Sequence, residues 1–447
     1  MTKRSEKMAT WPIPKLLFSM GIPAVFSMLI QALYNIVDTV FISQYSQDAM
    51  FAIGLAFPLQ MTGLSLALGL GVGTGTLVSR RLGEKRKEEA SKVASTSIIL
   101  ALIQVILVIL VGLFLTKPFL HLFTDRPEII ELGYSYLSIV LVFNFGQMFS
   151  VVIERIMQAQ GDMITPMMAL ITGAVTNIIL DPIFIFGYFG IPEMGIAGAA
   201  IATVIGQIAG CLVVVYAAVR GHKHEIKFEF KGFKWDMVVV RDIYSVGLPT
   251  AIMNMISSVT TTLMNGVLVN FSELAVTSLS LYFKLQSFVF MPVFGFNQGA
   301  LPILSYNFGA RDRKRYLETG KLYLATAFVF MFIGTILFTF TPKLMLSFFE
   351  TTPELDAIAV VTLKRIALSF IPAAFGISMS TMFQSLGRGT TSMIQSICRQ
   401  LIFLIPAAYV LANLGLDAVW YAYVIAEVLV CIIFAPILYK VYQNVFR

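Results

Sequence analysis

The sequence has little charge for its length. Only 13% of its 447 residues are charged, whereas 57% are hydrophobic and the mean hydropathy is +0.82. A soluble globular domain carries about 25% charged residues, so this composition excludes that class and predicts a polytopic membrane protein. The net charge of +7 does not indicate nucleic-acid binding, because the basic residues stand in short clusters between apolar runs.

Cysteine and histidine are also scarce. The three cysteines, Cys211, Cys398 and Cys431, all lie inside apolar runs, which predicts neither a disulfide nor a metal site for them. The three histidines fall in or beside the expected loops, and the sequence contains no HExxH, CxxC, GxSxG or Walker-type motif. We therefore expect neither an enzyme nor a resident cofactor.

Apolar runs are abundant. Cut at charged or Gly/Pro-rich breaks, they form twelve segments, each long enough to cross a bilayer. The first run is too long for a signal peptide and is expected to be retained. We expect an all-α integral membrane protein whose twelve transmembrane helices cover residues 14–43, 51–79, 93–116, 130–156, 163–187, 194–219, 239–268, 275–305, 320–341, 357–385, 390–413 and 417–440.

The lysines and arginines predict the orientation of these spans. If the N-terminus is cytoplasmic, most basic residues between spans fall on the cytoplasmic side. The opposite side then holds only Lys117, Arg126, Lys343, Lys364 and Arg365. This bias predicts a multi-pass protein of the cell membrane with both termini in the cytoplasm.

The two halves of the sequence repeat each other. Nine residues of the first half recur at an offset of 226, without a gap: Gly21, Pro23, Gly69, Gly73, Ser79, Gly83, Gln158, Gly161 and Thr165. Each half has six spans, so the repeats are parallel. We expect an N-lobe over residues 1–220, a cytoplasmic linker over 221–236 and a C-lobe over 237–447. Two such pseudo-symmetric six-helix lobes would enclose a central cleft that opens to either side by rocking.

Two aspartates break this symmetry. Asp38 lies inside the first span and Asp181 inside the fifth, both in the expected outer half of the membrane. The repeat places Met264 opposite Asp38, and an apolar stretch opposite Asp181. An acid inside a span is costly and is usually retained for function. We therefore expect the two carboxyl groups to form an ion site in the N-lobe.

Polar side chains accompany both aspartates on the same helix faces or on the next span: Tyr34, Asn35, Asn177 and Thr203. Pro182 cannot donate a backbone hydrogen bond, which frees a carbonyl group near Asp181. Together these groups suit either a proton or a sodium ion. The alternative is structural, with Asp38 making a packing hydrogen bond and Asp181 capping the freed backbone.

Further charges lie within or near the spans, among them Arg399, Lys284 and Glu427. Arg399 stands near the start of the eleventh span, and we expect its side chain to extend to the cytoplasmic surface. Lys284 and Glu427 lie deeper. They either form a lobe-stabilising pair, with each other or with the backbone, or contact a substrate.

Several ordered motifs resemble one family. The stretches VDTVFIS, GVGTGTLVSRRLGEK, QAQGD, NIILDPIFIFG and GIAGAAIAT are similar to those of MATE (multidrug and toxic compound extrusion) transporters, and the resemblance covers the whole chain. It is greatest to the prokaryotic branch with DinF-like and MepA-like exporters. The resemblance implies a secondary antiporter that exports cationic or amphipathic compounds in exchange for protons or sodium ions. We expect the protein to contact membrane lipids and to have no nucleic-acid partner. A single chain would form a complete transport path, so we expect it to function as a monomer.

The resemblance also implies roles for particular residues. The coupling site, with sodium as the possible metal, would comprise Asp38, Asn177, Asp181 and Thr203. Tyr34 and Gln31 match the neighbouring polar face of span one, and Pro23 matches a proline at which that span bends. Other branches carry an acid in span seven or ten, whereas here only Asp242 stands at the edge of span seven. A lipid-linked oligosaccharide flippase of the same superfamily is the alternative function, although it would need more basic residues in its cavity.

Overall fold

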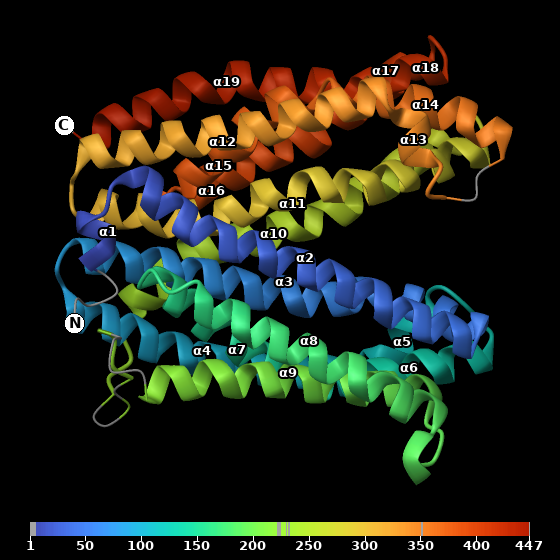
Figure 1. Ribbon diagram of the computed structural model, residues 1–447, viewed down its shortest axis with the longest axis horizontal. Coiled ribbons are helices and arrows are strands. Elements are labelled where there is room, and N and C mark those ends of the chain that lie inside the picture. Colours follow the sequence, from blue (N-terminus) through green and yellow to red (C-terminus); the bar gives the residue numbers. More distant parts are fainter. Residues whose placement is uncertain (1–5, 221–224, 229, 231–232, 350–351, 447) are drawn as a thin grey trace. The chain divides into compact units, whose positions relative to one another are not determined.

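The computed structural model describes residues 6–220, 225–228, 230, 233–349 and 352–446, and these contain helices and no strand (Figure 1). The first half contains α1 (Glu6–Thr10), α2 (Ile13–Tyr45), α3 (Gln47–Gly83), α4 (Lys87–Phe114), α5 (Thr116–His121), α6 (Pro127–Val142), α7 (Phe145–Ala159), α8 (Ile164–Phe186), the 3₁₀ turn η1 (Tyr188–Gly190) and α9 (Gly195–Arg220). The second half contains α10 (Met237–Leu268), α11 (Glu273–Gly309), α12 (Arg313–Phe340), α13 (Pro342–Leu346), α14 (Pro353–Ala367), α15 (Phe370–Ser385), α16 (Gly389–Ile397), the π-helix η2 (Cys398–Phe403), α17 (Leu404–Ala412), α18 (Leu416–Val419) and α19 (Tyr421–Val445).

Over the described residues, these helices account for the twelve predicted spans. Seven spans are the single helices α2, α3, α4, α8, α9, α11 and α12, and two more are the runs α16–η2–α17 and α18–α19. Spans four and ten are the bent pairs α6–α7 and α14–α15, which turn by 46° and 50°. The remaining helix, α10, has 32 residues, more than the roughly 20 needed to cross a bilayer. The all-α prediction is confirmed.

The repeat is visible in how helices begin and end. Ser46 caps α3 by accepting a hydrogen bond from the backbone NH of Ala49, and Ser272 caps α11 in the same way through Ala275. The turns that follow these two helices each contain a residue with positive φ, at Lys85 (62°) and Arg311 (53°). The capping serines are 226 residues apart, as are the strained basic residues, so the two halves share local geometry as well as sequence.

Contacts divide the described chain into two compact units. The first comprises the chain up to Trp11 and Phe26–Ala251, and the second comprises Pro12–Val25 and the chain from Ile252 onward. Thus α2 and α10 each contribute to both units, and their division points, Val25 and Ala251, are related by the repeat. The described part of the predicted linker belongs to the first unit. The division into lobes by order of spans remains a prediction.

Glycines of the repeat make the close helix contacts inside each unit. In the first unit, a Cβ on Gly69 of α3 would lie 2.6 Å from the carbonyl oxygen of Gly247 in α10. In the second unit, a Cβ on Gly299 of α11 would lie 2.9 Å from the backbone nitrogen of Gly21 in α2. Helices in membranes associate through such small residues, because they let two backbones approach. Gly21, Gly69, Gly73 and their repeat-related glycines are therefore packing positions, whereas Gly161 and Gly387 have positive φ.

The cores of the two units differ in side-chain size. Ala49, Ala52, Ala56, Ala199 and Ala200 are fully buried in the core of the first unit. The core of the second unit contains the fully buried or nearly fully buried aromatic residues Tyr282, Phe338, Phe370 and Trp420. Both cores also contain alanine and branched aliphatic side chains, so the difference between them lies in the large aromatic rings of the second.

Candidate functional site

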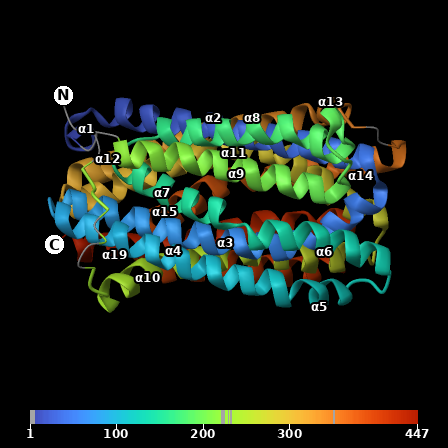
Figure 2. The same cartoon turned by 90° about the horizontal axis from the view of Figure 1, so that it is seen from below.

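The site is built on the contact between α8 and α9, which lie side by side in the first unit (Figures 1 and 2). A Cβ on Gly173 would lie 2.9 Å from the carbonyl oxygen of Gly206, and one on Gly210 would lie equally close to that of Ala169. Only glycine permits this approach. The short polar side chains that follow on the same faces are thereby brought within hydrogen-bonding reach.

Asn177 links the two helices. Its Nδ2 donates to Oδ1 of Asp181, one turn further along α8, at 3.3 Å, and to Oγ1 of Thr203 in α9 at 3.4 Å. Asp181 has no exposed surface, and Asn177 and Thr203 are only 2% and 4% exposed. A carboxyl group is thus held in the interior of the unit by a single amide.

The second half of α2 completes the cluster. The carboxyl group of Asp38 interacts directly with that of Asp181, and the hydroxyl of Tyr34 is hydrogen-bonded to Thr203. Asp38 and Tyr34 are partly buried. The structure therefore brings together five residues singled out from the sequence, namely Asp38, Asp181, Asn177, Thr203 and Tyr34, from three helices of one unit.

Three buried oxygens of this cluster lack a hydrogen-bond partner. They are Oδ1 of Asp38, Oδ2 of Asp181 and Oδ1 of Asn177. All three are acceptors, and buried acceptors are costly unless a donor or a cation satisfies them. A proton or a small hard cation such as sodium fits this set of donor atoms. The described residues contain no group of three His, Cys, Asp or Glu side chains suited to a transition metal.

Other residues singled out on α2 lie apart from this cluster. Gln31 and Asn35 have exposed side chains, although the backbone carbonyl of Asn35 accepts a hydrogen bond from Thr39. Pro23 lies inside α2, two residues before the point where this helix passes from one contact unit to the other. Pro182 also lies inside its helix, and α8 continues past it to Phe186.

Two residues of the cluster's surroundings were missed from the sequence. Tyr136 of α6 is 4% exposed, interacts electrostatically with Asp38 and is hydrogen-bonded to Gln60 of α3. Neither is ionised at neutral pH, and neither stands at a fixed spacing from an aspartate. The only signal was their polarity within apolar runs, which many residues of this chain share.

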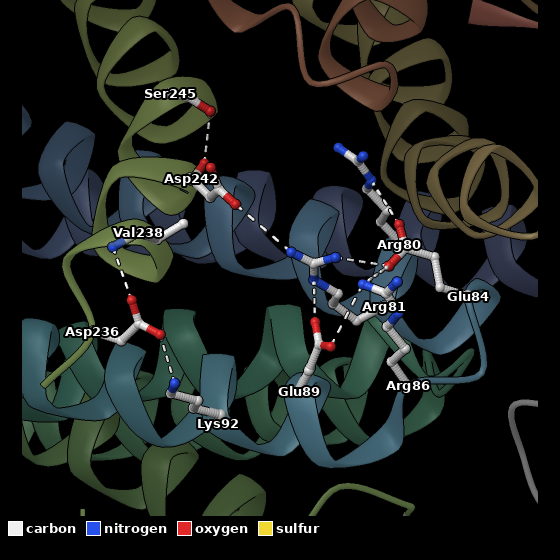
Figure 3. Close-up of polar contacts among 10 residues, drawn as sticks. All are labelled: Arg80, Arg81, Glu84, Arg86, Glu89, Lys92, Asp236, Val238, Asp242 and Ser245. Atoms are coloured by element: carbon white, nitrogen blue, oxygen red, sulfur yellow. Dashed lines mark hydrogen bonds and ion pairs between the residues drawn. The ribbon is translucent and has the colours of Figure 1, made fainter. Parts of the chain in front are cut away.

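A second polar cluster lies where α3, α4 and α10 come together (Figure 3). Arg81 stands among three carboxylates, with its nitrogens 2.8 Å from Glu84, 3.3 Å from Glu89 and 3.8 Å from Asp242. Close by, Lys92 lies 2.6 Å from Asp236, at the start of α10. These ion pairs join the turn after α3 to the beginning of α10 within the first unit.

The acids of this second cluster are tuned by their neighbours. Burial alone would raise the pKa of Glu84, but the hydrogen bonds and charges of Arg81 and Arg80 outweigh it and lower that pKa below its ordinary value of 4.5. The hydrogen bond from Lys92, aided by backbone donors, lowers the pKa of the exposed Asp236. Both groups are therefore charged at neutral pH and hold their basic partners.

The described residues of the predicted linker are bound to the same surface. Oε1 of Gln160 accepts the backbone NH groups of Glu225 and Ile226, at 2.9 and 3.3 Å, and Oγ of Ser91 accepts that of Lys227. Ile226 is buried. The linker is therefore a fixed strap over the described part of this surface, while residues 221–224, 229 and 231–232 lie outside the described residues.

Arg399 is paired with an acid. Its Nη1 lies 3.3 Å from Oε1 of Glu427 on α19, and the extension of its side chain to the cytoplasmic surface remains a prediction. Lys284 has an exposed side chain, and Glu427 is paired with Arg399 instead. The sequence placed the two intramembrane aspartates in the first half alone, and the structure shows that the second half contains a partly buried acid with a cationic partner.

The comparison with protein-family models decides the family. The model described as MatE matches residues 23–183 and 249–410, which is most of the chain and follows its internal repeat. The chain belongs to the MatE family. MatE proteins are membrane transporters, so this chain is a multi-pass transporter and not an enzyme.

Relatives in the MatE family match along nearly the whole chain. A multidrug export protein MepA from Staphylococcus saprophyticus is 26% identical over 409 residues, covering 91% of this chain and 89% of the relative. Among solved structures, a MOP superfamily transporter from Pyrococcus furiosus aligns with a TM-score of 0.93 at 25% identity over the full length of both chains. An outward-facing conformation of a multidrug resistance MATE family transporter aligns with the same score and coverage. The expected two-lobe, twelve-helix fold is thereby confirmed.

Proposed function

We propose that this transporter exports cationic or amphipathic drugs across the cell membrane in exchange for protons, and that Asp38 and Asp181 hold the coupling proton. The observation that carries the proposal is the direct interaction of these two carboxyl groups inside the first unit. Two charged carboxylates in contact repel each other strongly, so such a pair retains a proton. The relatives named multidrug export protein support the drug as the exported substrate.

Coupling follows from what the proton does to α2. With the proton shared, Asp38 stays attached to Asp181, and α2 is held against α8 and α9. When the proton leaves, repulsion drives the two helices apart. Pro23 is the proposed hinge, because it removes a backbone hydrogen bond close to where α2 changes contact unit. One protonation event would then shift the equilibrium between the two positions of the rocking lobes.

The alternative of a lipid-linked oligosaccharide flippase gains no support. A pyrophosphate group would require several uncompensated cations within the membrane. Of the cations deep in the described spans, Arg155 of α7 lies beside Glu154, Arg399 is neutralised by Glu427, and Lys284 has an exposed side chain. The acid-rich cluster of the first unit also has the wrong sign of charge for such a substrate.

Proteoliposomes with separately imposed gradients test the proposal. A fluorescent cationic dye should be exported when a proton gradient is imposed, and a protonophore should stop the export. The same vesicles with only a sodium gradient should show no export. Export driven by sodium alone would show that sodium is the coupling ion and binds the same oxygens. Export independent of both gradients would overturn the proposal.

Variants of Pro23 test the hinge separately. Pro23→Ala restores the missing backbone hydrogen bond, and we expect slower export with unchanged proton binding. Pro249→Ala, at the repeat-related position in α10, is the matched variant. If Pro23→Ala exports at the wild-type rate, bending at this position is not part of the cycle.

A further inference from the structure

The second unit contains a partly buried ion pair on helices that correspond to α8 and α9. Arg399 lies in η2, Glu427 lies in α19, and the side chains are 27% and 14% exposed. Only one contact joins them, at 3.3 Å, through Oε1 of the acid. Oε2 of Glu427 is buried and has no hydrogen-bond partner. An acid with one unpartnered oxygen in the interior of a membrane protein is energetically costly. Such acids are usually retained because they have a function.

Gln395 supplies a second unsatisfied oxygen beside this acid. Its Nε2 donates to the carbonyl oxygen of Gly376 at 2.9 Å, while its Oε1 is buried and has no donor. Gln395 is only 3% exposed. A Cβ on Gly376 would lie 3.1 Å from Oε2 of Glu427 and 4.0 Å from Nε2 of Gln395, so both side chains approach the same point on α15.

The repeat shows that this arrangement is specific to the second half. The counterparts of Gly173 and Gly206, which bring α8 and α9 together, are Arg399 and Ile432. The backbones cannot meet there as they do in the first unit. The chain around Arg399 is also a π-helix, from Cys398 to Phe403, whereas the corresponding stretch of α8 is regular α-helix. Such π segments widen a helix turn and occur frequently at functional sites.

We propose that Glu427 is a second proton-binding site, with Arg399 as its exchangeable counter-charge and Gln395 as the acceptor for the bound proton. In one arrangement the carboxylate is paired with Arg399. In the other, a proton bound to Oε2 makes a hydroxyl that donates to Oε1 of Gln395, and Arg399 is released with its charge unchanged. The proton is the only atom gained or lost, and each arrangement satisfies an oxygen that the other leaves without a partner.

The neighbouring groups are compatible with this exchange. On α19 itself, Tyr423 and Cys431 are near, and Sγ of Cys431 donates to the carbonyl oxygen of Pro372. Tyr282 faces the acid from α11, and α15 contributes no charged residue. Among the described residues, Arg399 is the only charged group that interacts with Glu427, and no second acid of this part of the chain competes for the proton, in contrast to the aspartate pair of the first unit.

Infrared difference spectroscopy of the purified transporter tests the inference. The spectrum is recorded between neutral and mildly acidic pH, where a protonated carboxyl group adds a carbonyl band. We expect one such band to be absent from Glu427→Gln and retained in the double variant Asp38→Asn, Asp181→Asn. We expect Arg399→Leu to show that band throughout the pH range, because the acid would then lack its counter-charge.

The inference extends the proposed function to a second proton. Its test does not depend on the proposed function, so the outcomes distinguish the two. If the spectrum of Glu427→Gln matches the wild type while the aspartate variant loses a band, the pair is a permanently charged structural contact and the inference fails alone. Gln395→Leu is the matched variant: it removes the acceptor without touching the ion pair, and should make protonation of Glu427 require a more acidic pH. An unshifted band in this variant would also contradict the proposed exchange.

Discussion

The fifth and sixth spans of the first repeat correspond to the last two spans of the second. The two pairs of spans accommodate buried polar groups in opposite ways. In the first unit, α8 and α9 meet at glycines, and a small amide-linked cluster holds two aspartates together. In the second, an arginine takes the place of a glycine, a π-helix widens the turn, and the acid is held by a cation. The duplicated fold thus contains a like-charge pair in its first repeat and an opposite-charge pair in its second.

The like-charge pair should be essential to coupling, and replacing one acid should have the largest effect. We expect Asp38→Asn to lose essentially all drug export, because the remaining carboxyl group no longer shares a proton. Drug efflux from intact cells, with protein levels in the membrane measured in parallel, provides the test. Met264→Leu, at the corresponding position of the second repeat, should export normally. Normal export by Asp38→Asn would remove the distinction between the two halves.

The amide and hydroxyl that position Asp181 should matter less than the acids. Thr203→Val preserves shape but removes the acceptor used by Asn177 and the partner of Tyr34. We expect about a fivefold lower transport rate, since a lost hydrogen bond contributes about 1 kcal/mol. Leu429→Val changes the corresponding position in α19 and serves as the control in the same vesicle assay. Equal rates for the two variants would show that the hydroxyl has no role.

The opposite-charge pair predicts a characteristic pattern of stability. Removing Arg399 leaves a buried acid that must take up a proton, at a cost in free energy, whereas removing both partners leaves an apolar contact. We therefore expect Arg399→Leu to lower the thermal unfolding midpoint more than the double variant Arg399→Leu, Glu427→Leu does. Unfolding in detergent, followed by tryptophan fluorescence, makes the comparison. A double variant less stable than either single variant would indicate that the pair contributes attraction beyond its desolvation cost.

The charge cluster in Figure 3 should give the smallest effect, because each exposed ion pair contributes about 0–1 kcal/mol. It too distinguishes the halves: Asp242 in α10 corresponds to the buried, apolar Leu16 in α2. The pKa of Glu84 is lowered, so its stabilising effect is complete above its ordinary value of 4.5 and is lost as pH falls through the lowered pKa. Below that pH, the wild type and Glu84→Gln should unfold at the same temperature, and at neutral pH the wild type should be slightly more stable. A constant difference across this range would contradict the assignment.

Much of this architecture could be predicted from the sequence because it depends on local patterns. The spans follow from apolar runs, and the grouping of Asp38 with Asp181, Asn177 and Thr203 follows from equal depth and helical spacing within a repeat. The partnership of Arg399 and Glu427 could not be predicted in this way. It depends on the rotation of α19 about its axis and on an extra residue in one turn of the eleventh span, and neither leaves a periodic signal.

The same limit applies to Tyr136 and Gln60. Tyr136 interacts with Asp38 from α6, Gln60 of α3 is linked to Tyr136, and the bend between α6 and α7 helps determine where α6 lies. Sequence spacing specifies which residues share a face of one helix, but it does not specify which neighbouring helix that face meets. The glycines that recur between the repeats were the exception, because a close backbone contact requires glycine on at least one of the two helices.

Proton release on drug binding tests the central claim most directly. A drug is added to the purified transporter in weakly buffered detergent solution, and the released protons are counted with a pH indicator. The account predicts release by the wild type and none from the Asp38/Asp181 pair in Asp38→Asn or Asp181→Asn, although Thr203→Val should retain it. If both aspartate variants bind drug and release as many protons as the wild type, the pair does not hold the coupling proton.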